Sequence, residues 1–289
     1  MSLPLLAPRP EPLLMGVVNV TPDSFSDGGR WLDPAAAVAH GLRLVADGAA
    51  IVDVGGESTR PGAERPDEAE ELRRVIPVVT ELVARGVDVS IDTMRAVVAD
   101  AAVAAGAGLV NDVSGGLADP DMAAVVAASG TPFVVMHWRG HSAGMQDEVH
   151  YDDVVADVRR ELGERVESLV AAGVARDRLV LDPGIGFAKH AEHNWRLLAG
   201  LSGGDGLDEL GLPVLVGTSR KTFLGRVGRD QDDPRPLAER DVATAVTTAA
   251  LAGTGVWGVR VHDVRASRDA LDVIAALTAA RPGGAGEAP

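Results

Sequence analysis

The stretches AAIVDVG (49–55), LRRVIPVVTELVARG (72–86) and DVSID (88–92) hold a strand, a helix and the next strand of a repeating pattern. Apolar residues recur through 72–83 at the 3.6-residue spacing of a helix that buries one face, and Gly86 stands where a helix commonly ends. The flanking stretches are short and mostly apolar, which is typical of parallel strands covered on both faces. This segment therefore predicts a strand–helix–strand unit.

The same pattern runs along almost the whole chain. Apolar runs begin near Leu13, Ala49, Asp88, Leu109, Phe133, Leu179, Val214 and Trp257. These starts are on average about 35 residues apart, which is room for one strand and one helix. Eight such units predict an α/β fold, the (β/α)8 TIM barrel, as a single domain over residues 13–280. The Pro-rich residues 1–12 are expected to be flexible, and residues 281–289 to form a disordered tail.

Composition and charge disfavour several function classes. The 27 Lys and Arg residues against 42 Asp and Glu residues give a net charge of −15, so we expect no nucleic-acid partner and no binding to an anionic membrane surface. The absence of Cys excludes disulfides and Cys-based zinc sites, and it fits a cytoplasmic location. No targeting segment is expected in residues 1–12. The uncharged run 242–259 contains Gly253 and Gly255 and is interpreted as helix, loop and strand, not as a membrane span.

Polar residues stand at the carboxyl end of nearly every predicted strand. In a barrel these ends meet at one rim, which is where barrel enzymes carry their chemistry. We therefore expect one shared site built from Asn19, Asp53, Glu57, Asp92, Asn111, Asp112, His137, Asp182, Ser219, Arg220, Lys221, Arg260, His262 and Asp263. The alternative is that each Asp or Asn only caps the turn after its strand. That alternative explains single residues better than it explains the joint set.

Seven longer strings follow the predicted strands in order. They are NVTPDSFSDGG (19–29), GGESTRPGA (55–63), SIDT (90–93), NDVSGG (111–116), DPGIGF (182–187), GTSRKTFLG (217–225) and RVHDV (260–264). Through these strings the chain resembles the dihydropteroate synthase family of the folate pathway, from Met15 to about Val273. The resemblance implies a transferase that joins (7,8-dihydropterin-6-yl)methyl diphosphate to 4-aminobenzoate, giving 7,8-dihydropteroate and diphosphate. It also implies a homodimer and Mg²⁺ as cofactor.

The pterin substrate presents a ring N–H beside an amino group, and two adjacent donors call for carboxylate acceptors. Asp92 and Asp182 resemble the pterin-binding aspartates of the family. Asn111 offers both a donor and an acceptor to the same ring, and Phe187 is expected to line the pocket. Lys221 is expected to donate to the ring carbonyl oxygen and to N5.

The leaving diphosphate calls for hydrogen-bond donors and positive charge. The predicted contacts are Asn19, Thr59, Arg60, Arg260 and His262. Asn19 is predicted as the single protein ligand of Mg²⁺, a cation that prefers oxygen ligands and substrate phosphates. The alternative for Asn19 is a turn-forming residue.

The loops after the first two strands are implied to shape the 4-aminobenzoate pocket. Its predicted contacts are Phe25, Thr59, Pro61, Ser219 and Lys221. The catalytic residues are predicted to be Asp92, Lys221 and Arg260. If diphosphate departs first, the electron-rich pterin shares the positive charge left on its CH₂ group, so the site needs electrostatic stabilisation more than a strong base.

Three other interpretations remain open. A pterin-binding methyltransferase that serves a corrinoid protein would share the barrel and the aspartates, but would have no reason to keep an Arg–His–Lys anion site. A Schiff-base aldolase would use Lys221. A silent relative would bind a pterin or a phosphate without turnover. No firm role is assigned to 137–139, and the acidic stretch 64–71 is interpreted as a solvated helix start.

Overall fold

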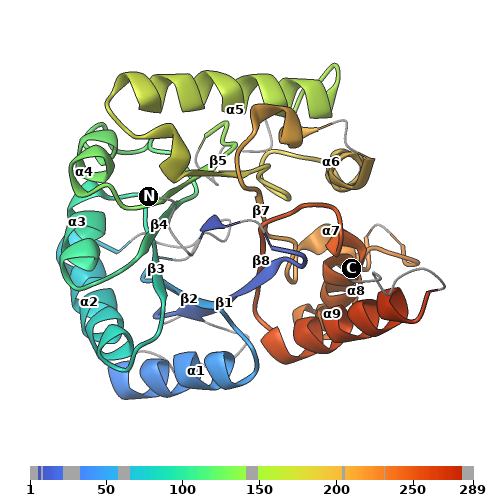
Figure 1. The fold of residues 1–289 in the computed structure, drawn as a ribbon, viewed down its shortest axis with the longest axis horizontal. Helices are drawn as coiled ribbons and strands as arrows, with labels where there is room; N and C mark the ends of the chain where they lie inside the picture. The colour runs from blue at the N-terminus through green and yellow to red at the C-terminus, as the bar shows by residue number, and fades with distance from the viewer. Residues whose placement is uncertain are drawn as a thin grey trace, which may run out of the picture.

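The protein is described by a computed structural model over residues 6, 7, 9–21, 33–57, 66–140, 149–203, 206–230 and 232–281. Within these ranges, eight parallel strands form one sheet in the order β6-β5-β4-β3-β2-β1-β8-β7. A parallel bridge between Leu181 and Val214 joins the two ends of that sheet. Figure 1 shows the strands at the centre and the helices around them. The predicted (β/α)8 barrel is confirmed.

All eight predicted apolar runs form strands. They are β1 (Leu13–Asn19), β2 (Ile51–Gly55), β3 (Val89–Asp92), β4 (Leu109–Asp112), β5 (Phe133–Met136), β6 (Leu179–Asp182), β7 (Leu215–Val216) and β8 (Gly258–Val261). The helices are α1 (Pro34–Ala46), α2 (Glu68–Ala84), α3 (Ala96–Ala104), α4 (Met122–Ser129), α5 (Val154–Ala171), α6 (Ala191–Gly203), α7 (Thr222–Gly225), α8 (Asp241–Leu251) and α9 (Val264–Ala279). In the described part of the chain, no helix combines the length and the apolar character needed to cross a bilayer.

Local signals set several helix boundaries. Asp33 caps α1 by accepting a hydrogen bond of 3.1 Å from the backbone N–H two residues on, and Pro34 opens the helix. The Asp119-Pro120 pair predicts a second start of this kind just before Met122, and α4 does begin at Met122, but its N-cap is Asp121, which makes no side-chain capping hydrogen bond. The Asp119 carboxylate instead accepts from the backbone N–H of Ala96 (2.8 Å) at the start of α3. A cap can therefore serve a neighbouring helix.

The bore of the barrel is apolar at the amino ends of the strands. Alternate strand residues point inward, and those nearest the amino ends form one buried cluster of Leu13, Met15, Ile51, Leu109, Val134, Val180, Leu215 and Trp257. Each such side chain stabilises the fold by roughly 1.5–3 kcal/mol when fully buried. The outward-facing strand residues pack against the helices in a larger second cluster. The apolar bore cluster supports the polar rim above it.

Regular elements run from Leu13 to Ala279. Of the predicted flexible ends, residues 1–5, 8 and 282–289 lie outside the described residues. Leu6 packs against the bore cluster, and Glu11 forms a bidentate ion pair with Arg268 (2.9 Å). The flexibility of the two ends stays a prediction.

Candidate active site

The polar strand ends meet at one rim of the bore. In the strand register, Asn19 pairs with Gly55, Gly55 with Asp92, and Asp92 with Asn111. Because all the strands are parallel, these residues from β1 to β4 lie at one level of the barrel. On the other side of the bore, Asp182 ends β6 opposite Met136. The register thus brings together residues that are far apart in the sequence.

Arg260 on β8 joins two carboxylates across the bore. Its Nε lies 2.6 Å from an Asp53 oxygen, and its Nη2 lies 2.6 Å from an Asp92 oxygen. The Asn111 amide donates to the same Asp53 oxygen (3.0 Å). Asp53 stood among the polar strand ends of the sequence but received no role there. The structure makes it the buried residue that orients both Arg260 and Asn111.

Burial and charge shift the ionisation of this cluster. Burial raises the pKa of Asp92 to about 7, although the positive charge of Arg260 lowers it. The neighbouring negative charge of Asp53 adds to the increase. Burial lowers the pKa of Arg260, but Asp53 and Asp92 outweigh it and hold that pKa above its ordinary value. Arg260 therefore stays charged, while Asp92 can exchange a proton near neutral pH.

Asp182 and Lys221 lie on the opposite side of the rim. An Asp182 oxygen accepts from the backbone N–H of Gly184 (2.7 Å). The Lys221 ammonium donates to the carbonyl oxygen of Ile185 and lies 4.6 Å from the centre of the Phe187 ring. Burial raises the pKa of Asp182, with Lys221 opposing, and burial lowers the pKa of Lys221 to about 8, with Asp182 opposing. The loop after β6 thus carries or contacts three of the predicted pterin residues.

Ser219 and His262 form a hydrogen-bonded pair. The backbone N–H of His262 donates to Ser219 Oγ (3.1 Å), and a second hydrogen bond joins Ser219 Oγ to His262 Nδ1 (2.9 Å). Arg220 lies between Ser219 and Lys221 at φ +60°, and its bidentate pair with Asp241 (2.7 and 2.8 Å) fixes this strained turn.

Asn19 ends β1 with a partly buried side chain. Within the described ranges, no hydrogen bond involves its side-chain amide, whose oxygen remains available as a ligand. No group of three or more His, Asp or Glu side chains placed to hold a metal occurs among the described residues. The donor set fits a Mg²⁺ ion that takes one protein oxygen and receives its other ligands from water and diphosphate.

Four predicted site residues cannot be placed. Phe25, Thr59, Arg60 and Pro61 lie outside the described residues. In the sequence, the first lies between β1 and α1, and the other three lie between β2 and α2. Their roles stay predictions.

Two polar groups differ from their sequence-based interpretation. Glu71 belongs to the stretch interpreted as solvated, yet it is fully buried and accepts hydrogen bonds from Thr93 (2.6 Å) and from Arg95. Asp112 ends β4 but points away from the site and caps the following turn through Ser114 and Gly116. For Asp112, the capping alternative is the correct one.

Comparisons with known proteins agree with this geometry. Residues 15–262 match the family of pterin binding enzymes. The dihydropteroate synthase of Mycobacterium leprae is 58% identical over 271 residues, which cover 93% of this chain and 94% of that protein. The corresponding enzyme of Bacillus subtilis is 44% identical over 90% of this chain and 86% of its own length.

Two solved structures are also similar to this chain in both sequence and fold. Xanthomonas albilineans dihydropteroate synthase with 4-aminobenzoic acid has a TM-score of 0.83 and 47% identity, covering 94% of each chain. The same enzyme in complex with 7,8-dihydropteroate has a TM-score of 0.80 and 44% identity, over 94% of this chain and 95% of the other. Sequence and fold agree, and the chain belongs to the dihydropteroate synthase family of pterin-binding enzymes.

Proposed function

We propose that this chain catalyses the dihydropteroate synthase reaction of folate biosynthesis. In it, (7,8-dihydropterin-6-yl)methyl diphosphate and 4-aminobenzoate give 7,8-dihydropteroate and diphosphate. The observation that carries the proposal is the set of Asp92, Asn111, Asp182 and Lys221 at one rim of the bore, in a chain of this family. The Xanthomonas structures contain 4-aminobenzoic acid and 7,8-dihydropteroate, a substrate and the product of this transferase reaction.

The pterin is held by its polar edge. Asp182 and Asp92 accept from the ring N–H and the amino group, and each charge-assisted hydrogen bond in a dry site contributes roughly 1.5–3 kcal/mol. Asn111 has its amide N–H₂ directed to Asp53, which leaves its carbonyl oxygen for the ring. Lys221, beside the Phe187 ring, donates to the pterin carbonyl oxygen and to N5.

The diphosphate meets the remaining donors of the rim. Arg260 uses Nε and Nη2 for the two carboxylates, so its Nη1 side faces the anion. His262 donates from Nε2, since Ser219 occupies Nδ1. Thr59 and Arg60 complete the predicted anion site from the loop after β2. Asn19 is the residue that would hold Mg²⁺, which neutralises diphosphate charge when bound.

Departure of diphosphate precedes attack by the arylamine in the proposed mechanism. Positive charge then develops on the pterin CH₂ group and spreads into the ring, where the negative charge of Asp92 stabilises it. 4-Aminobenzoate, held by Ser219 and Lys221 together with Phe25, Thr59 and Pro61, attacks without a covalent enzyme intermediate. Asp92→Asn should lower the rate of diphosphate release far more than it lowers pterin affinity. Equal losses in both would contradict this role.

A diphosphate-release assay tests the function. The purified chain is incubated with the pterin diphosphate, with and without 4-aminobenzoate and Mg²⁺, and both diphosphate and dihydropteroate are measured. The expected result is stoichiometric formation of both products only in the complete mixture. A chain that binds the pterin without turnover would be a silent relative. Methyl transfer to a corrinoid protein, or borohydride trapping of a carbonyl substrate on Lys221, would instead identify one of the two other enzyme classes.

We also propose a homodimer and a cytoplasmic location. Val242 and Val246 lie one turn apart on α8 and are 75% and 63% exposed, which is a large apolar exposure for two neighbouring positions. Light scattering should give twice the mass of one chain, and Val246→Glu should shift the population toward single chains. A wild-type mass of one chain would contradict the dimer. Fractionation of producing cells tests the location.

A further inference from the structure

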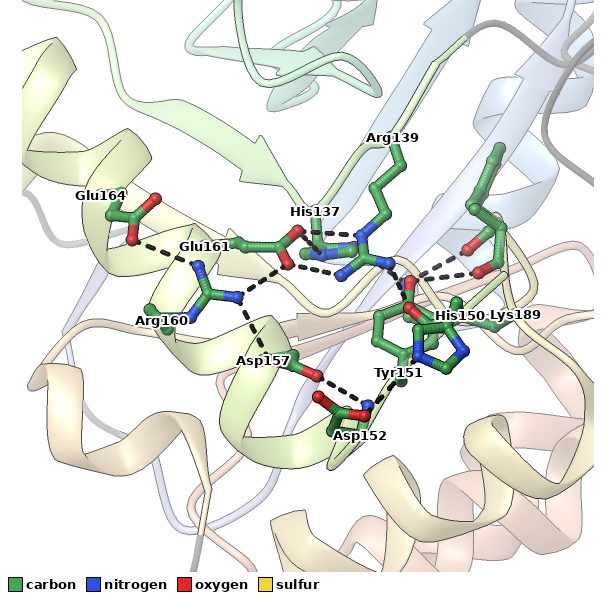
Figure 2. Close-up of polar contacts among 12 residues, drawn as sticks. His137, Arg139, His150, Tyr151, Asp152, Asp157, Arg160, Glu161, Glu164 and Lys189 are labelled. Atoms are coloured by element: carbon green, nitrogen blue, oxygen red, sulfur yellow. Dashed lines mark hydrogen bonds and ion pairs between the residues drawn. The ribbon is translucent and has the colours of Figure 1, made fainter. Parts of the chain in front are cut away.

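A second buried charge cluster lies beside the proposed pterin site, and the functions assigned above do not use it. Figure 2 shows His137, which follows β5, together with Glu161 of α5 and Lys189 of the loop after β6. Lys189 Nζ lies 3.0 Å from His137 Nδ1, and His137 Nε2 lies 2.9 Å from Glu161 Oε2. The three groups form a hydrogen-bonded chain from the rim to a helix of the outer layer.

The direction of these hydrogen bonds is fixed by Glu161. Burial raises the pKa of Glu161, but hydrogen bonds from His137 and Arg139 outweigh it and hold that pKa below its ordinary value. An ionised carboxylate only accepts, so His137 Nε2 carries a proton. Burial lowers the pKa of His137 to about 4, so the ring is neutral and Nδ1 is an acceptor. Lys189 therefore donates to it as an ammonium.

Lys189 also touches the turn that carries Asp182. Its ammonium donates to the Phe187 carbonyl oxygen (3.1 Å). A Cβ placed on Gly184 would lie 3.3 Å from Lys189 Nζ, and the Gly184 N–H is the group that binds Asp182. Ala188, the residue before Lys189, is held at φ +46°, and its carbonyl oxygen accepts from Tyr151 Oη (3.0 Å). Lys189 and Tyr151 together fix the loop after β6.

Lys189 adds a third cation beside the carboxylates of the rim. In the described part of the site, the carboxylates are Asp53, Asp92 and Asp182, and the cations are Arg260, Lys221 and Lys189. Arg260 is paired with the first two carboxylates. Burial raises the pKa of Asp182, whereas Lys221, the Gly184 N–H, Lys189 and Arg260 all oppose the rise.

We propose that Lys189 is a positioning residue of the pterin site, and that Glu161 controls its charge through His137. The ammonium keeps Asp182 ionised and holds the loop after β6 in the shape that receives the pterin edge. Asp182 must be ionised for both of its oxygens to act only as acceptors toward that edge. The inference rests on the proposed function and adds to it a residue and a dependence on pH.

The groups around Lys189 set the pH at which this control acts. Burial lowers the pKa of Lys189 to about 7. Asp182 and Glu161 oppose this decrease, while Lys221 and Arg139 add to it. The neutral His137 ring contributes a hydrogen bond without a charge. Asp92 and Lys221 also titrate in this range, so the contribution of Lys189 is a difference between variants: loss of its proton as the pH rises should weaken pterin binding relative to a variant whose cation at this position stays charged.

The test measures the dissociation constant of 6-hydroxymethyl-7,8-dihydropterin by fluorescence titration between about pH 6 and pH 9. Variants are compared with the wild type at each pH, because the ligand titrates identically in all of them. Lys189→Met should raise the Kd about tenfold at the acidic end, the equivalent of one pKa unit, and the ratio of its Kd to that of the wild type should fall toward one at higher pH, where the wild-type Lys189 has lost its proton. Lys189→Arg should keep the Kd within about threefold of wild type and stay charged throughout.

Glu161→Gln tests the chain of hydrogen bonds from outside the rim. It should lower by about one unit the pH at which the advantage over Lys189→Met disappears, because Lys189 loses a supporting negative charge. Glu164→Gln is the matched control: this residue lies on the same helix, is paired with Arg160 in Figure 2, and should leave the Kd unchanged. Circular dichroism verifies that each variant is folded. If Lys189→Met does not fold, the comparison of the Glu161→Gln and Glu164→Gln affinities across the pH range decides whether the proposal holds.

Three results would overturn the proposal. They are a wild-type Kd for Lys189→Met at every pH, a Lys189→Arg variant as weak as Lys189→Met, and a Glu161→Gln profile identical to that of Glu164→Gln. A wild-type chain that binds no dihydropterin would overturn the proposed function and this inference with it. Wild-type binding combined with unchanged variants would overturn the inference alone.

Discussion

The two ends of the barrel bore are built from the same strands and have opposite chemistry. Only two positions separate Ile51 from Asp53 on β2 and Val180 from Asp182 on β6, yet the first of each pair belongs to the apolar cluster and the second to the charged rim. Side chains two positions apart on a strand point to the same side, so both enter the bore. One end stabilises the barrel, and the other end keeps charges in a dry environment where their pKa values shift.

The largest expected effect comes from removing the charge that joins the rim. Arg260→Met leaves Asp53 and Asp92 facing each other without their shared partner, so Asp92 retains its proton to higher pH. We expect kcat/KM for the pterin diphosphate to fall about 10³-fold, the effect of losing a main electrostatic stabiliser. Steady-state kinetics measures it. Arg260→Lys should retain part of the activity. A decrease of kcat/KM of less than tenfold in Arg260→Met would contradict the assignment of catalysis to the charged end of the bore.

Leu109→Ala tests the apolar end. This fully buried residue of β4 lies two positions before Asn111. The cavity should lower the free energy of unfolding by roughly 2–5 kcal/mol and leave kcat/KM of the folded protein within about twofold of wild type. Urea denaturation and kinetics at low temperature measure the two quantities. Val97→Ala, at a half-exposed position of α3, is the control with little expected effect. A large loss of activity without loss of stability would show that the two ends are not separable.

The pH dependence of activity sharpens the comparison further. Burial raises the pKa of Asp92 to about 7, so in the free protein this carboxyl group is protonated below neutrality and ionised above it. Since the ionised form is required, kcat/KM should rise as the pH increases, with a slope of up to about tenfold per unit below the pKa. Asp92→Asn should lack this rise along with most activity. A wild-type profile that is flat between about pH 6 and pH 8 would contradict the shift.

The smallest effect is expected at the metal ligand. Asn19→Ala removes the one protein oxygen assigned to Mg²⁺, but water and diphosphate retain the other coordination positions. The Mg²⁺ concentration for half-maximal activity should rise by about tenfold, the effect of roughly 1.4 kcal/mol, with an unchanged maximal rate at saturating Mg²⁺. Chelation with EDTA should stop turnover in both proteins. An unchanged Mg²⁺ requirement in the variant would remove Asn19 from the metal site.

The fold and most of the rim could be predicted from sequence because both depend on short repeats. Continuous apolar runs ending in a polar residue placed Asn111, Asp182 and Arg260 on the carboxyl ends of strands, and the register places those ends around one opening. The partners of these residues could not be predicted in the same way. Arg260 donates to Asp53 across a sequence separation of 207 residues, and no local pattern marks such a pair.

Buried charges outside the strand ends were also missed. Glu71 lies in an acidic helical stretch typical of a solvated surface, but Arg95 and Thr93 reach it from the next βα unit and make its burial possible. His137 was among the polar strand ends but received no role there, and Lys189 stands in a short connection where sequence offers no periodicity. Their positions become informative only once α5 brings Glu161 to them.

The sequence alone determined the order and type of the elements, the polar ends of the strands and the family. These properties follow from backbone geometry, which repeats over a few residues and is therefore visible in the spacing of side chains. The tertiary structure decided which carboxylate shares which cation, which nitrogen of His137 carries the proton and which groups titrate near neutral pH. Those outcomes depend on the distance between side chains remote in sequence and on how far water is excluded from them, and both are fixed only when the barrel closes.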